Sequence, residues 1–136
     1  MTAFFDTNVV VYGFLDLEKR ERALEVMTDG GVISAQVLNE FTNVALNKRG
    51  RQWAEIEAAV AVITDQFDEV VPLTREIHAA AMTLARDHRL AFFDALIVAA
   101  ALSAGCETLY SEDMHHGARF GGLTIIDPFR GGPPAT

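Results

Sequence analysis

Cysteine is almost absent from this 136-residue sequence, which contains only Cys106. One thiol cannot form an internal disulfide or a cysteine-based zinc site, so we expect Cys106 to be a small packed hydrophobic residue in a reducing cytoplasm. No basic N-terminal segment precedes a long apolar run, so no secretory signal is expected. The longest apolar run, Ala95–Leu102, is far too short to cross a bilayer, and we expect no membrane association.

Basic residues are also scarce, because 11 Lys and Arg stand against 19 Asp and Glu for a formal net charge of −8. A chain this acidic is not expected to hold a polyanion on a broad basic face, so a nucleic acid would need a local basic rim or bound cations. The composition is otherwise that of a globular protein, with 50% hydrophobic and 22% charged residues. We expect one domain over residues 1–130 and a flexible Gly- and Pro-rich tail over residues 131–136.

Short apolar runs alternate with longer stretches of helical periodicity. Five runs are predicted as buried strands: residues 3–5, 31–34, 70–72, 108–110 and 123–126. The stretches between them are predicted as helices: residues 9–15, 18–27, 35–47, 52–67, 74–85 and 92–104. Thr7 or Asn8, Ser34 and Thr74 are predicted to cap three of these helices. The pattern predicts a three-layer α/β sandwich with a central parallel sheet of about four to five strands.

Four acidic residues occupy positions where an apolar core is expected. Asp6 ends the first strand, and Asp113 follows the strand at 108–110. Glu40 lies on the apolar side of its helix, and Asp94 opens the most apolar helix. Ligands of parallel α/β sheets bind at the carboxyl ends of the strands, where all four side chains could meet.

Grouped carboxylates are costly, because two unit charges about 4 Å apart repel by ~4 kcal/mol at an effective dielectric near 20. Such a group protonates, spreads apart or binds cations, and an all-oxygen donor set suits Mg²⁺ or Mn²⁺. These ions activate water for attack on phosphate, which points to hydrolysis of phosphodiester bonds. Taken singly, each acid could instead be a helix cap, a loop residue or the partner of a distant Arg.

Four sequence blocks together resemble the PIN-domain nucleases, with VapC-type toxins of toxin–antitoxin pairs as the nearest subgroup. The resemblance runs from Asp6 to Ile126 and depends on the order and spacing of the blocks, because a lone Asp-Thr-Asn is a weak signal. The blocks are Phe4-Phe5-Asp6-Thr7-Asn8-Val9, Asn39-Glu40-Phe41, Phe93-Asp94-Ala95-Leu96-Ile97 and Leu109-Tyr110-Ser111-Glu112-Asp113-Met114.

The resemblance implies a PIN-like fold and an endoribonuclease that cuts RNA with a water activated by Mg²⁺ or Mn²⁺. It also implies a homodimer and a small VapB-like antitoxin that binds near the site. The catalytic and metal-binding residues that it implies are Asp6, Glu40, Asp94 and Asp113. The supporting residues that it implies are Thr7, Asn8 and Ser111.

Two other classes of function are compatible with a carboxylate at a strand end. A phosphatase or phospho-acceptor domain could use Asp6, although a haloacid-type phosphatase needs a second Asp where this chain has Asn8. A non-catalytic binding module could keep the PIN-like fold, and would show no change in rate when Mn²⁺ is added.

The remaining polar and aromatic residues are given ordinary interpretations. Glu112 is either an outer-shell ligand or, as we favour, exposed, and His115 and His116 lie in a solvated loop, with substrate contact as the lesser alternative. Trp53 is expected to belong to the core or to a subunit contact. A basic rim that guides RNA past the acids is considered without assigning its residues. Its candidates are Lys48, Arg49, Arg51, Arg86, Arg89 and Arg119.

Overall fold

The computed structural model describes residues 2–15 and 18–130 and consists of one six-stranded sheet with helices on both faces. The predicted tail at 131–136 lies outside the described residues. In sheet order the strands are β3 (Glu69–Val71), β2 (Val32–Ser34), β1 (Ala3–Phe5), β4 (Thr108–Tyr110), β6 (Leu123–Ile126) and β5 (Arg119–Phe120). All neighbouring strands are parallel except β5 and β6, which are antiparallel. The predicted α/β sandwich with a mostly parallel sheet is therefore confirmed.

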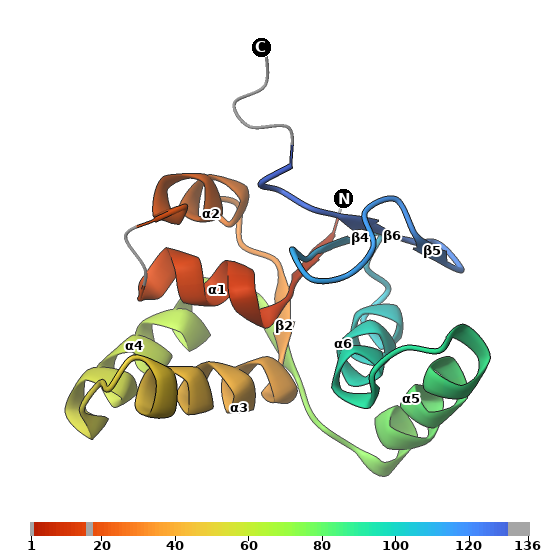
Figure 1. Cartoon of the computed structure of the whole chain (residues 1–136), viewed down its shortest axis with the longest axis horizontal. Helices are drawn as coiled ribbons and strands as arrows, with labels where there is room; N and C mark the ends of the chain where they lie inside the picture. Colours follow the sequence, from red (N-terminus) through yellow and green to blue (C-terminus); the bar gives the residue numbers. More distant parts are fainter. Residues whose placement is uncertain (1, 16–17, 131–136) are drawn as a thin grey trace.

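The helices are α1 (Thr7–Phe14), α2 (Arg20–Val26), α3 (Ala35–Asn43), the π-helix η1 (Val44–Lys48), α4 (Trp53–Gln66), α5 (Arg75–His88) and α6 (Phe92–Ser103). Along the chain, the strands are added outward from β1 to β2 and then β3. The connection after β3 passes back over β2 and β1 to reach β4 on the other side of β1. Because such crossovers are right-handed, α1 to α4 cover one face and α5 and α6 the other, as Figure 1 shows. The direction of winding reverses between β1 and β4, which is where α/β sheets open a crevice for ligands.

Helices α1, α3 and α5 each begin after a polar side chain that accepts a hydrogen bond from a free N–H group of the first turn. Ser34 and Thr74 accept hydrogen bonds from the N–H groups of Val37 and Ile77, so both predicted caps are confirmed. The predicted cap of the first helix is wrong, because Asp6 caps α1 and the helix already includes Thr7. The cap therefore comes from a candidate catalytic residue.

The core draws on strands and helices of every layer, and β1 and α6 contribute its most continuous buried apolar runs. Phe4 and Phe5 are fully buried, and the ring of Phe5 stacks on Tyr110 with centroids 5.4 Å apart. All seven residues from Ala95 to Ala101 are buried, as expected for the most apolar helix. Cys106 is also buried, as predicted. In the part of the chain that the structure describes, every helix is too short or too polar to span a bilayer.

Three features differ from the sequence-based prediction. The sheet has a sixth strand, because the two-residue strand β5 is too short to produce a periodic pattern. The predicted helix at 35–47 is an α-helix only as far as Asn43 and continues as a π-helix. Trp53 is not in the core, one of its two predicted locations, because 57% of its surface is exposed at the start of α4, and a subunit contact stays a prediction.

Candidate active site

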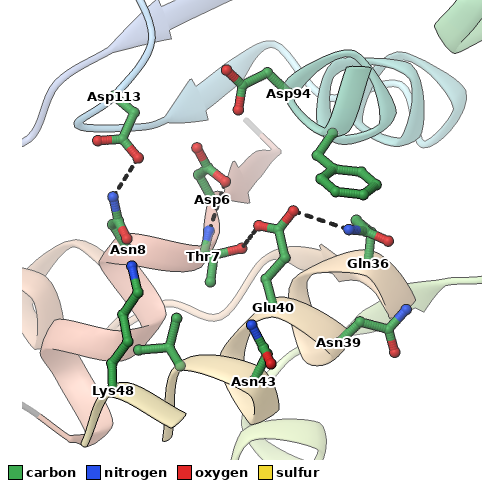
Figure 2. A pocket seen from close by; sticks show the side chains of 12 residues that line it. Asp6, Thr7, Asn8, Gln36, Asn39, Glu40, Asn43, Lys48, Asp94 and Asp113 are labelled. Atoms are coloured by element: carbon green, nitrogen blue, oxygen red, sulfur yellow. Dashed lines mark hydrogen bonds between the residues drawn. The ribbon is translucent and has the colours of Figure 1, made fainter. Parts of the chain in front are cut away.

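A pocket of about 380 Å³ lies at the carboxyl ends of β1 and β4, where the winding of the sheet reverses. Figure 2 shows the carboxylates of all four predicted acids around a common space, from four different parts of the chain. The described residues that line it are Asp6, Thr7, Asn8, Gln36, Asn39, Glu40, Asn43, Val44, Lys48, Phe93, Asp94 and Asp113. The structure therefore brings together Asp6, Glu40, Asp94 and Asp113, which lie far apart in the sequence.

Asp6 is the most enclosed of the four acids, with 4% of its surface exposed. Its Oδ1 accepts a hydrogen bond from the Thr7 N–H at 2.7 Å, and its Oδ2 accepts one from the Ser111 hydroxyl at 2.7 Å. Burial raises the pKa of Asp6 from 3.8 to about 7, in spite of these two hydrogen bonds, and the charges of Glu40 and Asp94 raise it further. The folded chain therefore holds a carboxyl group here that resists ionisation when no cation is near.

Glu40 is oriented by two neutral donors, one on each carboxylate oxygen. Thr7 Oγ1 donates to Oε1 at 2.6 Å, and Gln36 Nε2 donates to Oε2 at 2.9 Å. Gln36 lies one turn before Glu40 on α3, so the two side chains share a face of the helix. Sequence reasoning missed Gln36, although its spacing of four residues from a candidate acid could have identified it.

Asp94 and Asp113 face each other across the mouth of the pocket (Figure 2). Partial burial raises the pKa of Asp94, and the charges of Asp113 and Glu40 raise it further. The pKa of Asp113 is raised by partial burial and by Glu112 and Glu40, although the Asn8 amide that donates to its Oδ2 acts in the opposite direction. These shifts show that the acids repel one another in this arrangement.

The residues predicted to support the site all contact an acid. Thr7 bonds to Glu40, Asn8 to Asp113, and Ser111 to Asp6. Ser111 lies behind the pocket and is fully buried, and its oxygen also accepts the Met114 N–H at 3.2 Å. The backbone turn after β4 is thus tied to the acid at the end of β1.

The acidic groups do not converge into a preformed metal cluster. Within residues 2–15 and 18–130, no group of three or more His, Cys, Asp or Glu side chains is placed to hold a metal ion as the side chains stand. Neutral partners hold two of the acids apart, since Asn8 bonds to Asp113 and Gln36 to Glu40. Of the described residues that line the pocket, Lys48 is the one cation, so the acid charge is only partly balanced.

Glu112 differs from the prediction that it would be exposed. It is partly buried, and its carboxylate bonds to Lys19 and to the Tyr12 hydroxyl. His115 is exposed as expected, whereas His116 is half-buried, and its Nδ1 accepts the Asp127 N–H at 3.0 Å. Both His78 and His88 lie exposed on α5.

Replacing Ser111 by Ala should lower the free energy of unfolding by about 1–3 kcal/mol, because the buried Met114 N–H and Asp6 Oδ2 would each lose a hydrogen-bond partner. Urea unfolding at neutral pH measures the loss. The exposed Ser103→Ala at the end of α6 is the matched control and should be neutral. Equal stability of the two variants would contradict this role of Ser111.

Several solved structures share this fold. A toxin–antitoxin complex from Klebsiella pneumoniae is 21% identical over 93% of this chain and 98% of that chain, with a TM-score of 0.71. The Mycobacterium tuberculosis toxin VapC20, described as cleaving the sarcin–ricin loop, is 18% identical over 82% of this chain and 90% of its own, with a TM-score of 0.69. VapBC2 from Rickettsia felis, solved with a promoter DNA fragment, is 16% identical over 92% of this chain and 97% of that chain, with a TM-score of 0.68.

A comparison with curated proteins gave no significant match. The sequence profile of the PIN domain, however, matches residues 3–118, which include all four pocket acids and every strand from β1 to β4. Since this match covers most of the chain, the protein belongs to the PIN domain family.

Proposed function

We propose that this PIN domain is a divalent-metal-dependent endoribonuclease, the toxin of a VapC-type toxin–antitoxin pair. The observation that carries the proposal is the buried Asp6, whose pKa is raised to about 7 in a pocket that also holds three further carboxylates. An acid that resists ionisation in the free protein is expected to bind a cation strongly once it ionises. Membership of the PIN family and the fold shared with VapC20 support the same assignment.

The donor chemistry of the pocket fits Mg²⁺ or Mn²⁺. The residues that would hold the ion are Asp6, Glu40, Asp94 and Asp113, whose carboxylate oxygens are the ligands these hard cations prefer. No cysteine lines the pocket, and neither described His of the 115–116 loop does. When bound, such an ion polarises the scissile phosphate and lowers the pKa of a water molecule at neutral pH.

The polar partners of the acids orient them before RNA arrives. Ser111 and the Thr7 N–H hold the two oxygens of Asp6, so its carboxylate cannot rotate freely. Thr7 and Gln36 hold Glu40 with its carboxylate facing the same space. Because these carboxylates are already oriented, less free energy is needed to order them when the substrate binds. Such pre-organisation is what a protein contributes to phosphodiester hydrolysis of this kind.

Removal of divalent cations should abolish RNA cleavage by the purified chain. The measurement is cleavage of total RNA with Mg²⁺, with Mn²⁺ and with EDTA, followed by sequencing of the new RNA ends. Activity should fall below detection in EDTA and return when Mn²⁺ is added in excess. Undiminished cleavage in EDTA, or a rate that Mn²⁺ does not change, would exclude the proposed chemistry.

The proposal includes two protein partners. Relatives with this fold were solved as toxin–antitoxin complexes, including VapBC from Salmonella typhimurium bound to DNA, and we infer a VapB-like antitoxin for this chain. We also infer a homodimer, for which exposed apolar side chains on the α5 side, Leu73 and Met82, offer contact surface. RNA is the substrate that we infer for the pocket itself.

A further inference from the structure

An aromatic side chain stands exposed at the mouth of the acidic pocket. Phe93 has 63% of its surface exposed, the highest value among the large hydrophobic residues that the structure describes. It precedes Asp94 in the first turn of α6 and lines the pocket. Nothing in the described fold covers the ring, whose nearest aromatic neighbour is the tilted ring of Phe92, with centroids 6.4 Å apart. An exposed ring face beside a reactive centre is suited to stack on a planar group.

The side chain of Lys48 reaches the same pocket from the end of the π-helix η1. The N–H of Arg49 bonds to the carbonyl of Val44 five residues back at 3.0 Å, which closes the wide turn of η1. In a regular α-helix at about 100° per residue, Lys48 would lie about 120° around the axis from Gln36 and about 40° beyond Val44, at the margin of the face that lines the pocket. The wider turn brings Lys48 back to the face that carries Gln36 and Asn43. Such turns are rare and occur often at functional sites.

The charge of Lys48 is available for a ligand. Among the residues that the structure describes, none forms an ion pair or hydrogen bond with its ammonium group, although four carboxylates line the same pocket. Figure 2 shows its side chain extending from the end of η1 toward Asn8. Nearby, Asn43 Oδ1 accepts a hydrogen bond from Asn47, which leaves the Asn43 amide N–H groups to act as donors. This side of the pocket therefore offers positive charge and donors, which phosphate requires.

We propose that Phe93 and Lys48 position the substrate on either side of the acids, with Phe93 stacked on an unpaired base and Lys48 bound to a backbone phosphate. This inference rests on the proposed function and adds the residues that hold the RNA. Stacking on Phe93 requires a base that is free of its neighbour, which a duplex does not offer. Lys48 gives an acidic chain the local positive charge that an RNA backbone needs.

The test measures binding of a fluorescein-labelled eight-nucleotide RNA by anisotropy, in Mg²⁺ and in an Asp94→Asn background that does not cleave it. Phe93→Ala should weaken binding about tenfold, whereas Phe93→Trp should bind as well as the parent and Phe93→Leu should bind poorly. Lys48→Ala should weaken binding several-fold and flatten the salt dependence by about 0.7 in log–log slope, the value for one lost phosphate contact on a single strand. Lys48→Arg should restore both the affinity and the salt dependence to those of the parent.

Matched variants outside the pocket control for exposed surface and charge. Trp53→Ala removes an aromatic residue that is 57% exposed at the start of α4, and Arg75→Ala removes an exposed cation from α5. Both should bind the RNA as the parent does. The same RNA annealed to its complement should bind equally to the parent and to Phe93→Ala, since no free base remains to stack.

The outcomes separate this inference from the proposed function. Weaker binding in Phe93→Ala and Lys48→Ala supports the inference even if the intact chain cleaves no RNA, a result that would overturn only the proposed function. Active cleavage together with unchanged binding in both variants overturns the inference alone. If Phe93→Ala changes the oligomeric state in light scattering and loses affinity only for that reason, the ring is a subunit contact and the inference also fails.

Discussion

Asp6→Asn should reduce RNA cleavage by about 100- to 1,000-fold while leaving the fold intact. A cation held against a phosphate contributes several kcal/mol to transition-state stabilisation, and each 1.36 kcal/mol corresponds to a factor of ten in rate. Removing the charge of the most enclosed acid weakens that hold, whereas Asn keeps the shape of Asp. Initial rates of oligoribonucleotide cleavage in Mn²⁺ measure the loss.

The control variant for this experiment is Asp65→Asn, an exposed acid in the last turn of α4 and far from the pocket lining. It removes one negative charge without touching the site, and its cleavage rate should equal that of the parent. Circular dichroism of both variants should match the parent. A well-folded Asp6→Asn that cleaves at the parent rate would remove Asp6 from the mechanism.

The same Asp6→Asn variant should be more stable than the parent in EDTA at pH 8. The pKa of Asp6 is about 7 in the folded chain against an ordinary 3.8, because burial opposes its ionisation. The folded state therefore keeps the Asp6 proton up to a higher pH than the unfolded state does. As a result, the free energy of unfolding falls as pH rises from about 4 through 7. Asn has no proton to lose, so it avoids a cost of up to about 4 kcal/mol, which is the shift of about three pKa units converted to energy.

Asn also preserves the local contacts of Asp6. It is as good an N-cap as Asp, so it can accept the Thr7 N–H at the start of α1. Its amide can donate to the Ser111 oxygen, which accepts as well as donates, but the buried Ser111 hydroxyl hydrogen then loses Asp6 Oδ2 as its acceptor. That loss is the same at every pH, so the effect of the Asp6 charge appears as the change in relative stability between acidic and alkaline pH.

Urea unfolding in EDTA at pH 4.5 and pH 8 measures this effect. The stability of Asp6→Asn relative to the parent should rise by several kcal/mol from pH 4.5 to pH 8, and excess Mg²⁺ at pH 8 should reduce this rise by stabilising the parent. Asp65→Asn should show no such dependence on pH. A variant that gains no stability relative to the parent between pH 4.5 and pH 8 would mean that burial of the Asp6 charge is not a cost to the fold.

These two results together would show that the fold tolerates an unfavourable charge in exchange for activity. Natural proteins often depart from the most stable choice at their functional sites, and the pocket acids are the clearest departure in this chain. Asp94 and Asp113 contribute in the same direction, because burial and the charges of neighbouring carboxylates raise the pKa of both. The free protein is therefore expected to be most stable at mildly acidic pH.

Much of the fold was predictable because it depends on local pattern. The apolar run from Ala95 to Ala101 predicts a buried helix, and Ser34 and Thr74 predict helix starts, since capping involves residues only a few positions apart. Strand β5 was missed, because two residues produce no periodicity and pair only through the neighbouring strand β6. For Trp53 the sequence left the core and a subunit contact open, and only its exposure excluded the core, because an aromatic residue at a helix start does not reveal which face the fold covers.

The sequence by itself determined that acidic residues lie at strand ends and near helix starts. Parallel strands then bring those positions to one edge of the sheet, at the carboxyl ends of the strands. Only the tertiary structure decided which contacts each acid makes. The Ser111–Asp6 hydrogen bond joins residues 105 positions apart, and Glu112 pairs with Lys19 across 93 positions. No periodicity encodes contacts of this range, because they arise from the packing of elements whose local patterns are independent.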